Sequence, residues 1–329
     1  MKLSFLLITI SLTALLSGCG SSSEDKKSAS ESPFPGSSSS SNSSDAKSEV
    51  ATTSTTTSNS VASSSIGSSA VNSSSAANVS VACITQECES QNKTLVLKIY
   101  NDVINNKQID LIESLFETNV KLHIPGANNG STAEASHLQN LQNNNPGYIA
   151  TVKHIGADGD YVAVHWHLSA KPDNEFNGKA VVDLYKLAGG KIVDHWHLTQ
   201  ILSKPTASGN SLFSDLYKYT GTKPLATQES EAANKLLVTS TYLGLFNDKN
   251  LSLIDQNIAP SYLQHNPYVP NGSDALRNFV SSRTPGGLSF FATISDDDLV
   301  WTFSGNGNLT LVDIFRVDNK KIVEHYDVF

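Results

Sequence analysis

The amino-acid sequence predicts an α+β protein, in which two tandem domains follow a long polar segment. Three observations support this fold class. Three blocks of residues recur in the same order, each copy places helices before antiparallel strands, and residues 20–81 are dominated by Ser, Thr, Asn and Ala. Helices followed by a run of strands are typical of α+β folds, whereas strict alternation would indicate a parallel sheet.

The polar segment, residues 19–83, has almost no aromatic side chains. Such a composition buries too little apolar surface to offset the entropy lost on ordering. We therefore expect a disordered Ser/Thr-rich tether, with a root-mean-square reach of about 45 Å for about 60 residues.

Residues 1–18 have the layout of a secretory signal peptide, with Lys2 followed by a short apolar run. The run is too short to span a bilayer as a stable helix. It ends in "LSGC", which resembles the lipobox of bacterial lipoproteins. This resemblance implies cleavage before Cys19 and lipidation of its thiol, and an ordinary signal peptide with a chance cysteine is the alternative. We expect a lipid-anchored protein of the cell envelope, and Gly20 favours the outer membrane.

The charge of the chain limits the classes of partner that it can bind. The chain carries a formal charge of −8 and has no basic cluster after residue 84, which argues against nucleic acid and against anionic lipid as partners. Contact with the membrane is expected through the N-terminal lipid only.

Cys83 and Cys88 lie outside a CxxC pattern and have no histidine nearby, so an oxidising compartment favours a structural disulfide between them.

An internal repeat determines the predicted domain organisation. Residues 94–200 align with residues 235–329, and three blocks match in the same order. The matched residues include His123 with His265, Asp183 with Asp313, Tyr185 with Phe315, and His195 with His325. This pattern predicts a tandem duplication, with domains at 84–205 and 227–329 joined by a linker at 206–226.

Each copy predicts the same series of elements. Apolar residues at four-residue spacing predict an amphipathic helix at 92–105 and again at 229–247. A short helix follows in each copy, then a His/Pro/Asn-Gly segment, then a third helix with a Ser or Thr N-cap. The short helices are expected at 108–117 and 249–257, the N-caps at Ser131 or Thr132 and Ser273, strands at 161–169 and 299–305, and closing hairpins at 179–187 with 191–199 and 309–317 with 321–328.

The segments "YLQHNPYVPNG", "GDYVAVHWHL" and "VVDLYKLAGGKIVDHWHLTQ" resemble the SnoaL-like family, which belongs to the nuclear transport factor 2-like superfamily. The resemblance covers both copies. It implies that each copy forms a cone, in which a curved antiparallel sheet wraps around helices and leaves a pocket between them. The superfamily is functionally diverse, so the function has to be argued from the site.

The register of the closing hairpin decides which side chains meet. A three-residue loop, Ala188–Gly190, places Asp183 opposite His195, whereas a two-residue Gly189-Gly190 loop places Asp183 opposite Trp196. We favour the first register because it pairs an acid with an imidazole in both copies, with Asp313 opposite His325.

An Asp–His pair in a mostly apolar cone can transfer protons without a metal or cofactor. In SnoaL-type polyketide cyclases an aspartate acts as acid and base in an aldol ring closure, and the resemblance places this role on Asp183 and Asp313. We expect His195, or His265 with His325, to complete the catalytic set for a small apolar carbonyl compound. The alternative is a pair that only ties two strands together.

Other polar and aromatic side chains are candidates for binding the small molecule. They are His123, His165, Trp166, His167 and Tyr185 in the first copy, and Tyr262, Asn266 and Phe315 in the second. The two "HWH" strings, at 165–167 and 195–197, would suit a divalent metal only if their strands were neighbours with matching faces. Polar rings lining a pocket explain them more simply, and we expect neither a metal nor a cofactor.

A second functional class remains open, namely a non-catalytic module that binds a small molecule or a protein at the cell envelope. Cone domains often pair through the outer face of the sheet, and tandem copies could do so within one chain or between two chains. Arg316 follows Asp313 by three residues, so it is expected on the opposite face, at the surface or an interface.

Overall fold

The computed structural model describes residues 82–202 and 206–329. The expected signal peptide, Cys19 and nearly all of the expected tether lie outside the described residues. Within the described ranges, the helices are too short or too polar for any of them to cross a membrane.

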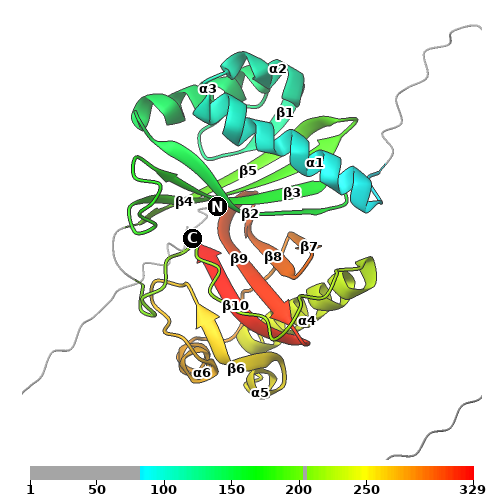
Figure 1. The fold of residues 1–329 in the computed structure, drawn as a ribbon, viewed down its shortest axis with the longest axis vertical. Helices are drawn as coiled ribbons and strands as arrows, with labels where there is room; N and C mark the ends of the chain where they lie inside the picture. The colour runs from blue at the N-terminus through cyan, green and yellow to red at the C-terminus, as the bar shows by residue number, and fades with distance from the viewer. Residues whose placement is uncertain (1–81, 203–205) are drawn as a thin grey trace, which may run out of the picture. The chain divides into compact units, whose positions relative to one another are not determined.

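The first domain begins with helices and ends with an antiparallel series of strands (Figure 1). Helix α1 continues into a π-helical segment at Ile99–Asn105, and a 3-10 turn at Ile109–Leu111 leads into α2. The elements are α1 Gln86–Lys98, α2 Ile112–Leu115, β1 Phe116–His123, α3 Ser131–Asn144, β2 Ile149–Asp158, β3 Tyr161–Ser169, β4 Gly178–Ala188 and β5 Lys191–Leu202.

The second domain repeats this order of elements. Its three helices lie on one side of its own sheet, as the helices of the first domain do (Figure 1). The elements are α4 Gln228–Phe246, α5 Ser252–Asn257, β6 Ile258–Gln264, α6 Ser273–Ser281, β7 Ala292–Asp296, β8 Leu299–Asn306, β9 Asn308–Asp318 and β10 Lys321–Val328.

The two five-stranded sheets have the same topology, β1-β5-β4-β3-β2 and β6-β10-β9-β8-β7. The predicted α+β class is confirmed, and the arrangement is consistent with two tandem cone folds. The sheets are mixed rather than wholly antiparallel, because β1 pairs parallel to β5 and β6 pairs parallel to β10. The last four strands of each domain alternate in direction, and the first strand joins the free edge of the last one in the same direction.

The Asn-Gly pair that closes each His/Pro segment holds the turn into the third helix. Gly130 and Gly272 have φ of 108° and 99°, a conformation that favours glycine, and each donates its N–H back to the preceding strand. Asn129 and Asn271 accept the N–H of Leu122 and Gln264 at 2.9 and 2.8 Å. The expected serine N-caps are therefore wrong, since these glycines occupy the N-cap positions.

The closing hairpins differ from both predicted registers. Their loops have two residues, and both residues have positive φ in each domain, which matches the twist of the strands. A one-residue bulge at Val193 in β5 and at Val323 in β10 then shifts the pairing. As a result Asp183 lies opposite His197 and Asp313 lies opposite Asp327.

Alternation along the strands gives each sheet two apolar faces. The inner faces pack on the helices of their own domain in two separate clusters. The outer faces share a third cluster, which includes Val182, Leu184 and Trp196 of the first domain, Trp301, Phe303 and Ile314 of the second, and Leu212 and Phe213 between them.

The approach of the two outer faces is close at Gly156 in β2. A Cβ at this position would lie 2.9 Å from Nε1 of Trp301 in β8. The backbone N–H of Ala157 donates to Asp296 Oδ2 at 2.9 Å, and Lys93 contacts the same oxygen at 2.5 Å. Side chains of both domains therefore meet around this glycine.

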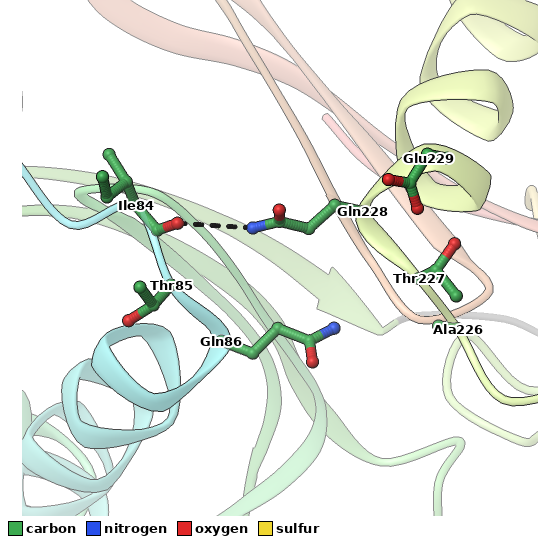
Figure 2. A pocket seen from close by; sticks show the side chains of 7 residues that line it. All are labelled: Ile84, Thr85, Gln86, Ala226, Thr227, Gln228 and Glu229. Carbon is green, nitrogen blue, oxygen red and sulfur yellow. Dashed lines mark hydrogen bonds between the residues drawn. The ribbon is translucent and has the colours of Figure 1, made fainter. Parts of the chain in front are cut away.

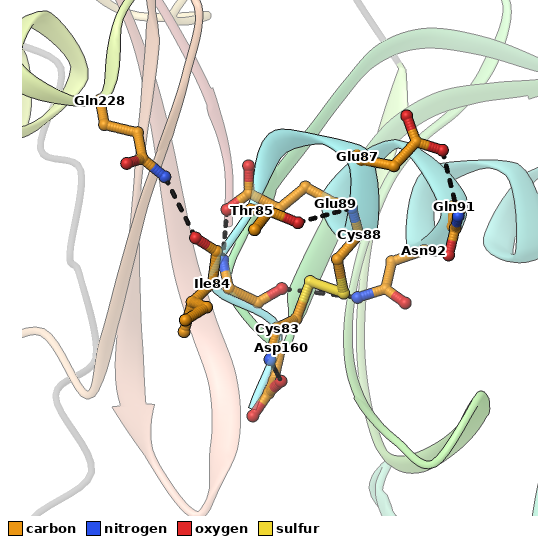
Figure 3. The surroundings of a disulfide bond; sticks show 11 residues. Cys83, Ile84, Thr85, Glu87, Cys88, Glu89, Gln91, Asn92, Asp160 and Gln228 are labelled. Carbon is orange, nitrogen blue, oxygen red and sulfur yellow. Dashed lines mark hydrogen bonds between the residues drawn. A yellow bond between two sulfur atoms is a disulfide. The ribbon is translucent and has the colours of Figure 1, made fainter. Parts of the chain in front are cut away.

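The N-terminus of α1 is held by a disulfide between Cys83 and Cys88 (Figure 3). Thr85 caps the helix by accepting the N–H of Cys88 at 3.2 Å, and Cys83 donates its N–H to Asp160 at 2.8 Å. These contacts connect the start of α1 to the turn between β2 and β3.

We predict that Gly156→Ala destabilises the protein by about 1–3 kcal/mol, because the added methyl group overpacks the contact with Trp301. In the double variant with Trp301→Phe, which removes the indole nitrogen, the alanine should cost less. Urea unfolding of both single variants and the double variant measures this coupling. Strictly additive effects would show that the two residues do not meet.

Candidate functional site

The inner face of the first domain carries a polar cluster around the Asp183 carboxylate. Oδ1 lies 2.7 Å from Nδ1 of His197 and 3.3 Å from Nε2 of His195. Oδ2 accepts hydrogen bonds from Nε1 of Trp166 and from the hydroxyl of Tyr100, each at 2.7 Å. Asp183 is 2% exposed, and among its four partners His197 has a side chain that is 13% exposed.

Helix α3 contributes two further side chains to this cluster, Glu134 and His137. Nδ1 of His195 lies 3.2 Å from Oε2 of the fully buried Glu134, whose Oε1 has no hydrogen-bond partner among the described residues. His137, one helical turn further on, faces the ring of His197 at 5.1 Å. Neither Glu134 nor His137 was among the residues predicted from the sequence. Their i, i+3 spacing in "STAEASHL" was the available signal, since it places both on one helix face.

Within this cluster, the Asp183 carboxylate and the His195 imidazole form an ion pair. Burial alone would raise the pKa of Asp183, but the neighbouring His197 and His195 outweigh burial and hold it well below its ordinary value. Burial would lower the pKa of His195, yet Glu134 and Asp183 raise it to about 10. Burial and the nearby His197 lower the pKa of His137 to about 4. At neutral pH, His195 is therefore an imidazolium between two carboxylates.

The second domain carries the corresponding cluster on β9 and β10. Nε2 of His325 lies 3.0 Å from Oδ1 of Asp313, and its Nδ1 donates to Oε1 of Gln264 at 2.7 Å. Asp327 lies opposite Asp313 in the ladder and accepts a hydrogen bond from Asn266. Its second oxygen, Oδ1, is buried without a partner among the described residues.

Burial raises the pKa of Asp327 to about 6. The charge of His325 opposes this shift, whereas that of Asp313 adds to it, because two nearby carboxylates resist double ionisation. The two clusters therefore differ in electrostatics, since the pKa of Asp183 is lowered in the first and that of Asp327 is raised in the second.

Aromatic rings enclose both clusters. Tyr185 stacks on His195 with ring centroids 4.5 Å apart, and Phe315 packs against His325 at 4.8 Å. Tyr262 is buried, and its hydroxyl lies 3.3 Å from that of Tyr242. These three predicted residues thus lie at the inner clusters, together with Trp166 and Asn266.

Four of the predicted histidines lie elsewhere. His165 and His167 point to the outer face of β3 and pack against Phe213, so the two "HWH" strings face opposite sides of the sheet and the four imidazoles do not converge. Trp166, which lies between His165 and His167 in β3, faces the inner core, because successive side chains of a strand point to opposite faces of the sheet. The expectation that His165 and His167 line the cone pocket is therefore wrong.

His265 and His123 also lie on the outer side. Nε2 of His265 lies 3.0 Å from Oε1 of Glu324, and its ring stacks on Tyr326. The expected partnership of His265 with Asp313 is therefore wrong. His123 contacts Asp194 at 2.8 Å and stacks on Trp196 at 4.2 Å.

Arg316 faces away from Asp313, as predicted. It is buried at the contact between the outer faces, where its Nε lies 3.0 Å from Glu324 and its Nη1 lies 2.6 Å from Asp298. A third carboxylate, Asp215 from the segment between the domains, also binds this guanidinium.

Two sets of three side chains bring metal-ligand atoms within 4.8 Å of one another in the described part of the chain. They are Asp183, His195 and His197 in the first domain, and Asp313, His325 and Asp327 in the second.

A surface pocket lies apart from both clusters (Figure 2). It is lined by residues at the N-terminal ends of α1 and α4, namely Ile84, Thr85, Gln86, Ala226, Thr227, Gln228 and Glu229. Gln228 donates to the carbonyl of Ile84 at 3.4 Å across it. None of the predicted site residues lines this pocket, so it is not the candidate site.

We predict that Gln264→Leu destabilises the protein by about 3 kcal/mol. The change leaves two buried donors without an acceptor, namely Nδ1 of His325 and the backbone N–H of Asn266, and each unpaired donor costs about 1–3 kcal/mol. The backbone N–H of His265 also loses Gln264 but still donates to the carbonyl of His325. Gln256→Leu, the same change on an exposed face of α5, should alter stability by less than about 0.5 kcal/mol. Equal effects of the two substitutions in urea unfolding would contradict the role of Gln264.

One protein-family model matches part of the chain. The model of the SnoaL-like polyketide cyclase family matches residues 94–203, which is less than half of the chain. No curated protein matches the chain.

Among solved structures, a SnoaL-like polyketide cyclase from Agrobacterium tumefaciens is 18% identical, covering 33% of this chain and 91% of its own, with a TM-score of 0.28. IdmH from Streptomyces antibioticus is also 18% identical, covering 32% of this chain and 90% of its own, with a TM-score of 0.27. Neither likeness carries an argument about activity. Residues 94–203 therefore combine the sequence pattern of a SnoaL-like polyketide cyclase domain with the α+β fold described above.

Proposed function

We propose that the inner cluster of the second domain is a proton-transfer site, and that the protein is a cofactor-independent cyclase or isomerase of the aldol type. The observation that carries this proposal is the pair of carboxylates at opposing ladder positions, Asp313 and Asp327, with His325 hydrogen-bonded to the first. The pKa of Asp327 is raised to about 6, so this group can hold and release a proton close to neutral pH, as acid–base catalysis requires.

The proposed reaction begins with a small apolar carbonyl compound. The Asp313 carboxylate removes a proton from the carbon next to the carbonyl, and protonated Asp327 hydrogen-bonds to the oxygen on which negative charge develops. For a cyclisation, the enolate carbon then attacks a second carbonyl, one C–C bond forms, and the new alkoxide takes the proton of Asp327. Return of the proton from Asp313 to Asp327 restores both groups, so no oxidant, reductant or cofactor is needed.

The first domain is less suited to this chemistry, because Asp183 is held in an ion pair with imidazolium His195 at neutral pH. A group whose pKa lies far below the working pH is a weak base. We therefore place the proton transfer on the second domain and keep the pair of Asp183 and His195 as a secondary candidate.

We predict that Asp313→Asn abolishes turnover while leaving the melting temperature nearly unchanged. Incubation with a panel of ketones and β-diketones in D₂O, monitored by ¹H NMR, detects exchange of the protons next to the carbonyl. The natural chain should accelerate exchange for at least one member of the panel, and the variant should lose this by at least about 100-fold. Asp255→Asn, on the exposed side of α5, is the matched control. Exchange at the buffer rate with the whole panel, or full activity in Asp313→Asn, would refute the proposal, and loss of folding would show a structural role instead.

The raised pKa of Asp327 also predicts a pH dependence of stability. Its ordinary value is 3.8 and its value in the folded protein is about 6, so between these pH values the folded state binds the proton that the unfolded state has lost. This group therefore reduces the free energy of unfolding as pH rises through that window, by at most about 3 kcal/mol in total. Asp327→Asn should remove this slope, so the variant gains stability over the natural chain between about pH 4 and 6. Parallel unfolding curves at all pH values would contradict the assignment.

Burial supports a second candidate, a non-catalytic module that binds a small apolar molecule. Asp183, His195, Asp313 and His325 are each at most 5% exposed, and such clusters can also serve only to organise a fold. Native mass spectrometry of the purified chain would distinguish the candidates. A retained small molecule that is never converted favours the binding module.

We also propose that the chain is held at the cell envelope by a lipid on Cys19. The proposal rests on the "LSGC" string at the end of the leader-like segment. The intact mass of the chain purified from membranes tests it, because a Cys19→Ala variant should lack the lipid mass and leave the membrane fraction.

A further inference from the structure

We propose that Asp183, His195 and His197 of the first domain form a binding site for one divalent transition-metal ion. This inference is independent of the proton transfer assigned to the second domain. Asp183 Oδ1 lies 2.7 Å from His197 Nδ1 and 3.3 Å from His195 Nε2. Ligand atoms that surround a Zn²⁺ ion tetrahedrally at about 2.0–2.2 Å are themselves separated by about 3.3–3.6 Å. The three donor atoms lie within 4.8 Å of one another, so small side-chain shifts would bring them to the spacing of a coordination shell.

Each of the three side chains also has its other polar atom fixed by a partner. Oδ2 of Asp183 accepts from Trp166 and Tyr100, and Nδ1 of His195 donates to Glu134. This carboxylate–histidine contact holds one proton of His195 on Nδ1, so a metal ion would bind Nε2 by displacing the other proton, which faces Asp183. Metal-ligating histidines and carboxylates usually have such outer partners, which orient them and raise their affinity.

The imidazole of His197 also has a partner on the side away from the proposed ion. Nε2 of His197 lies 2.8 Å from the hydroxyl of Thr199, so its Nδ1 is the atom that faces Asp183. The side chain of His197 is 13% exposed, the only member of the three with appreciable exposure. An ion can therefore reach the cluster from this side, and a water molecule could occupy a fourth position.

The charge of the cluster also calls for a cation. Once Nε2 of His195 has released its proton to a metal ion, as binding requires, the positive charge of the imidazolium is lost and Asp183 and the fully buried Glu134 lie as two acidic groups next to the ion in the protein interior. Glu134 Oε1 has no hydrogen-bond partner among the described residues, and an uncompensated buried charge is costly. One divalent ion would cancel both charges. Two imidazole nitrogens and one carboxylate suit Zn²⁺, Fe²⁺ or Ni²⁺ rather than Mg²⁺ or Ca²⁺.

The second domain provides an internal contrast. Asp327 stands in the ladder position of His197, which leaves a single imidazole in the set. His325 donates to the neutral amide of Gln264 rather than to a carboxylate, and Asp327 is engaged by Asn266. The features that select a transition metal are thus confined to the first domain.

The test is isothermal titration of the full chain, freed of metal by a chelator, with ZnSO₄ at neutral pH, together with visible spectroscopy after addition of Co²⁺. We expect one Zn²⁺ per chain and a Co²⁺ spectrum of low coordination number. His197→Asp, which copies the second domain, should weaken binding by at least about 100-fold. Glu134→Gln should weaken it by about 10- to 100-fold. His123→Gln, which removes a partly exposed histidine outside the set, should bind like the natural chain.

Two outcomes would overturn the proposal. The first is the absence of heat and of a Co²⁺ spectrum with the natural chain, a result that does not depend on whether any variant folds. The second is binding that survives His197→Asp and Glu134→Gln, or binding that is lost only on His123→Gln, since either would place the ion elsewhere.

Discussion

A one-residue bulge near the start of the last strand of each domain is the constraint on which the candidate sites depend. The hairpin loops have two residues, and without the bulges at Val193 and Val323 this loop length would place Asp183 opposite Trp196. The extra residue restores the parity, so that aspartate and histidine share the inner face while Trp196 and Tyr326 turn outward. The proposed proton transfer, the proposed metal site and the packing of the two sheets all depend on which face each of these side chains occupies.

The two faces then have different roles. The inner faces hold the buried carboxylate–imidazole clusters against the helices, whereas the outer faces share an apolar cluster crossed by a polar network around Arg316. Histidines occur on both faces, and their chemistry depends on which one they occupy. His195 lies between two carboxylates, whereas His165 lies against Phe213 at the contact between the sheets.

The inner histidines of the two domains make an equivalent hydrogen bond to different secondary-structure elements. Nδ1 of the inner histidine needs an acceptor in both, and this acceptor is Glu134 of α3 in the first domain and Gln264 of β6 in the second. In the second domain, Leu276 occupies the position that Glu134 has in α3. In the first domain, Leu122 occupies the position that Gln264 has in β6. A carboxylate in one place and an amide in the other give the two inner histidines different partners, and in the second cluster burial raises the pKa of Asp327 to about 6.

The sequence by itself determined the α+β class, the order of the elements and the residues Asp183, His195, Asp313 and His325, because hydrophobic periodicity, turn residues and the internal repeat are local signals. It could not determine the register, since a bulge leaves no mark in the pattern of polar and apolar residues. The spacing of Glu134 and His137 shows that they share a helix face, but not that this face meets β5, because the helix is separated from β5 by some 50 residues of chain. Only the tertiary structure decided which histidines meet a carboxylate, because strand parity and helix packing set the distances between side chains that are far apart in the sequence.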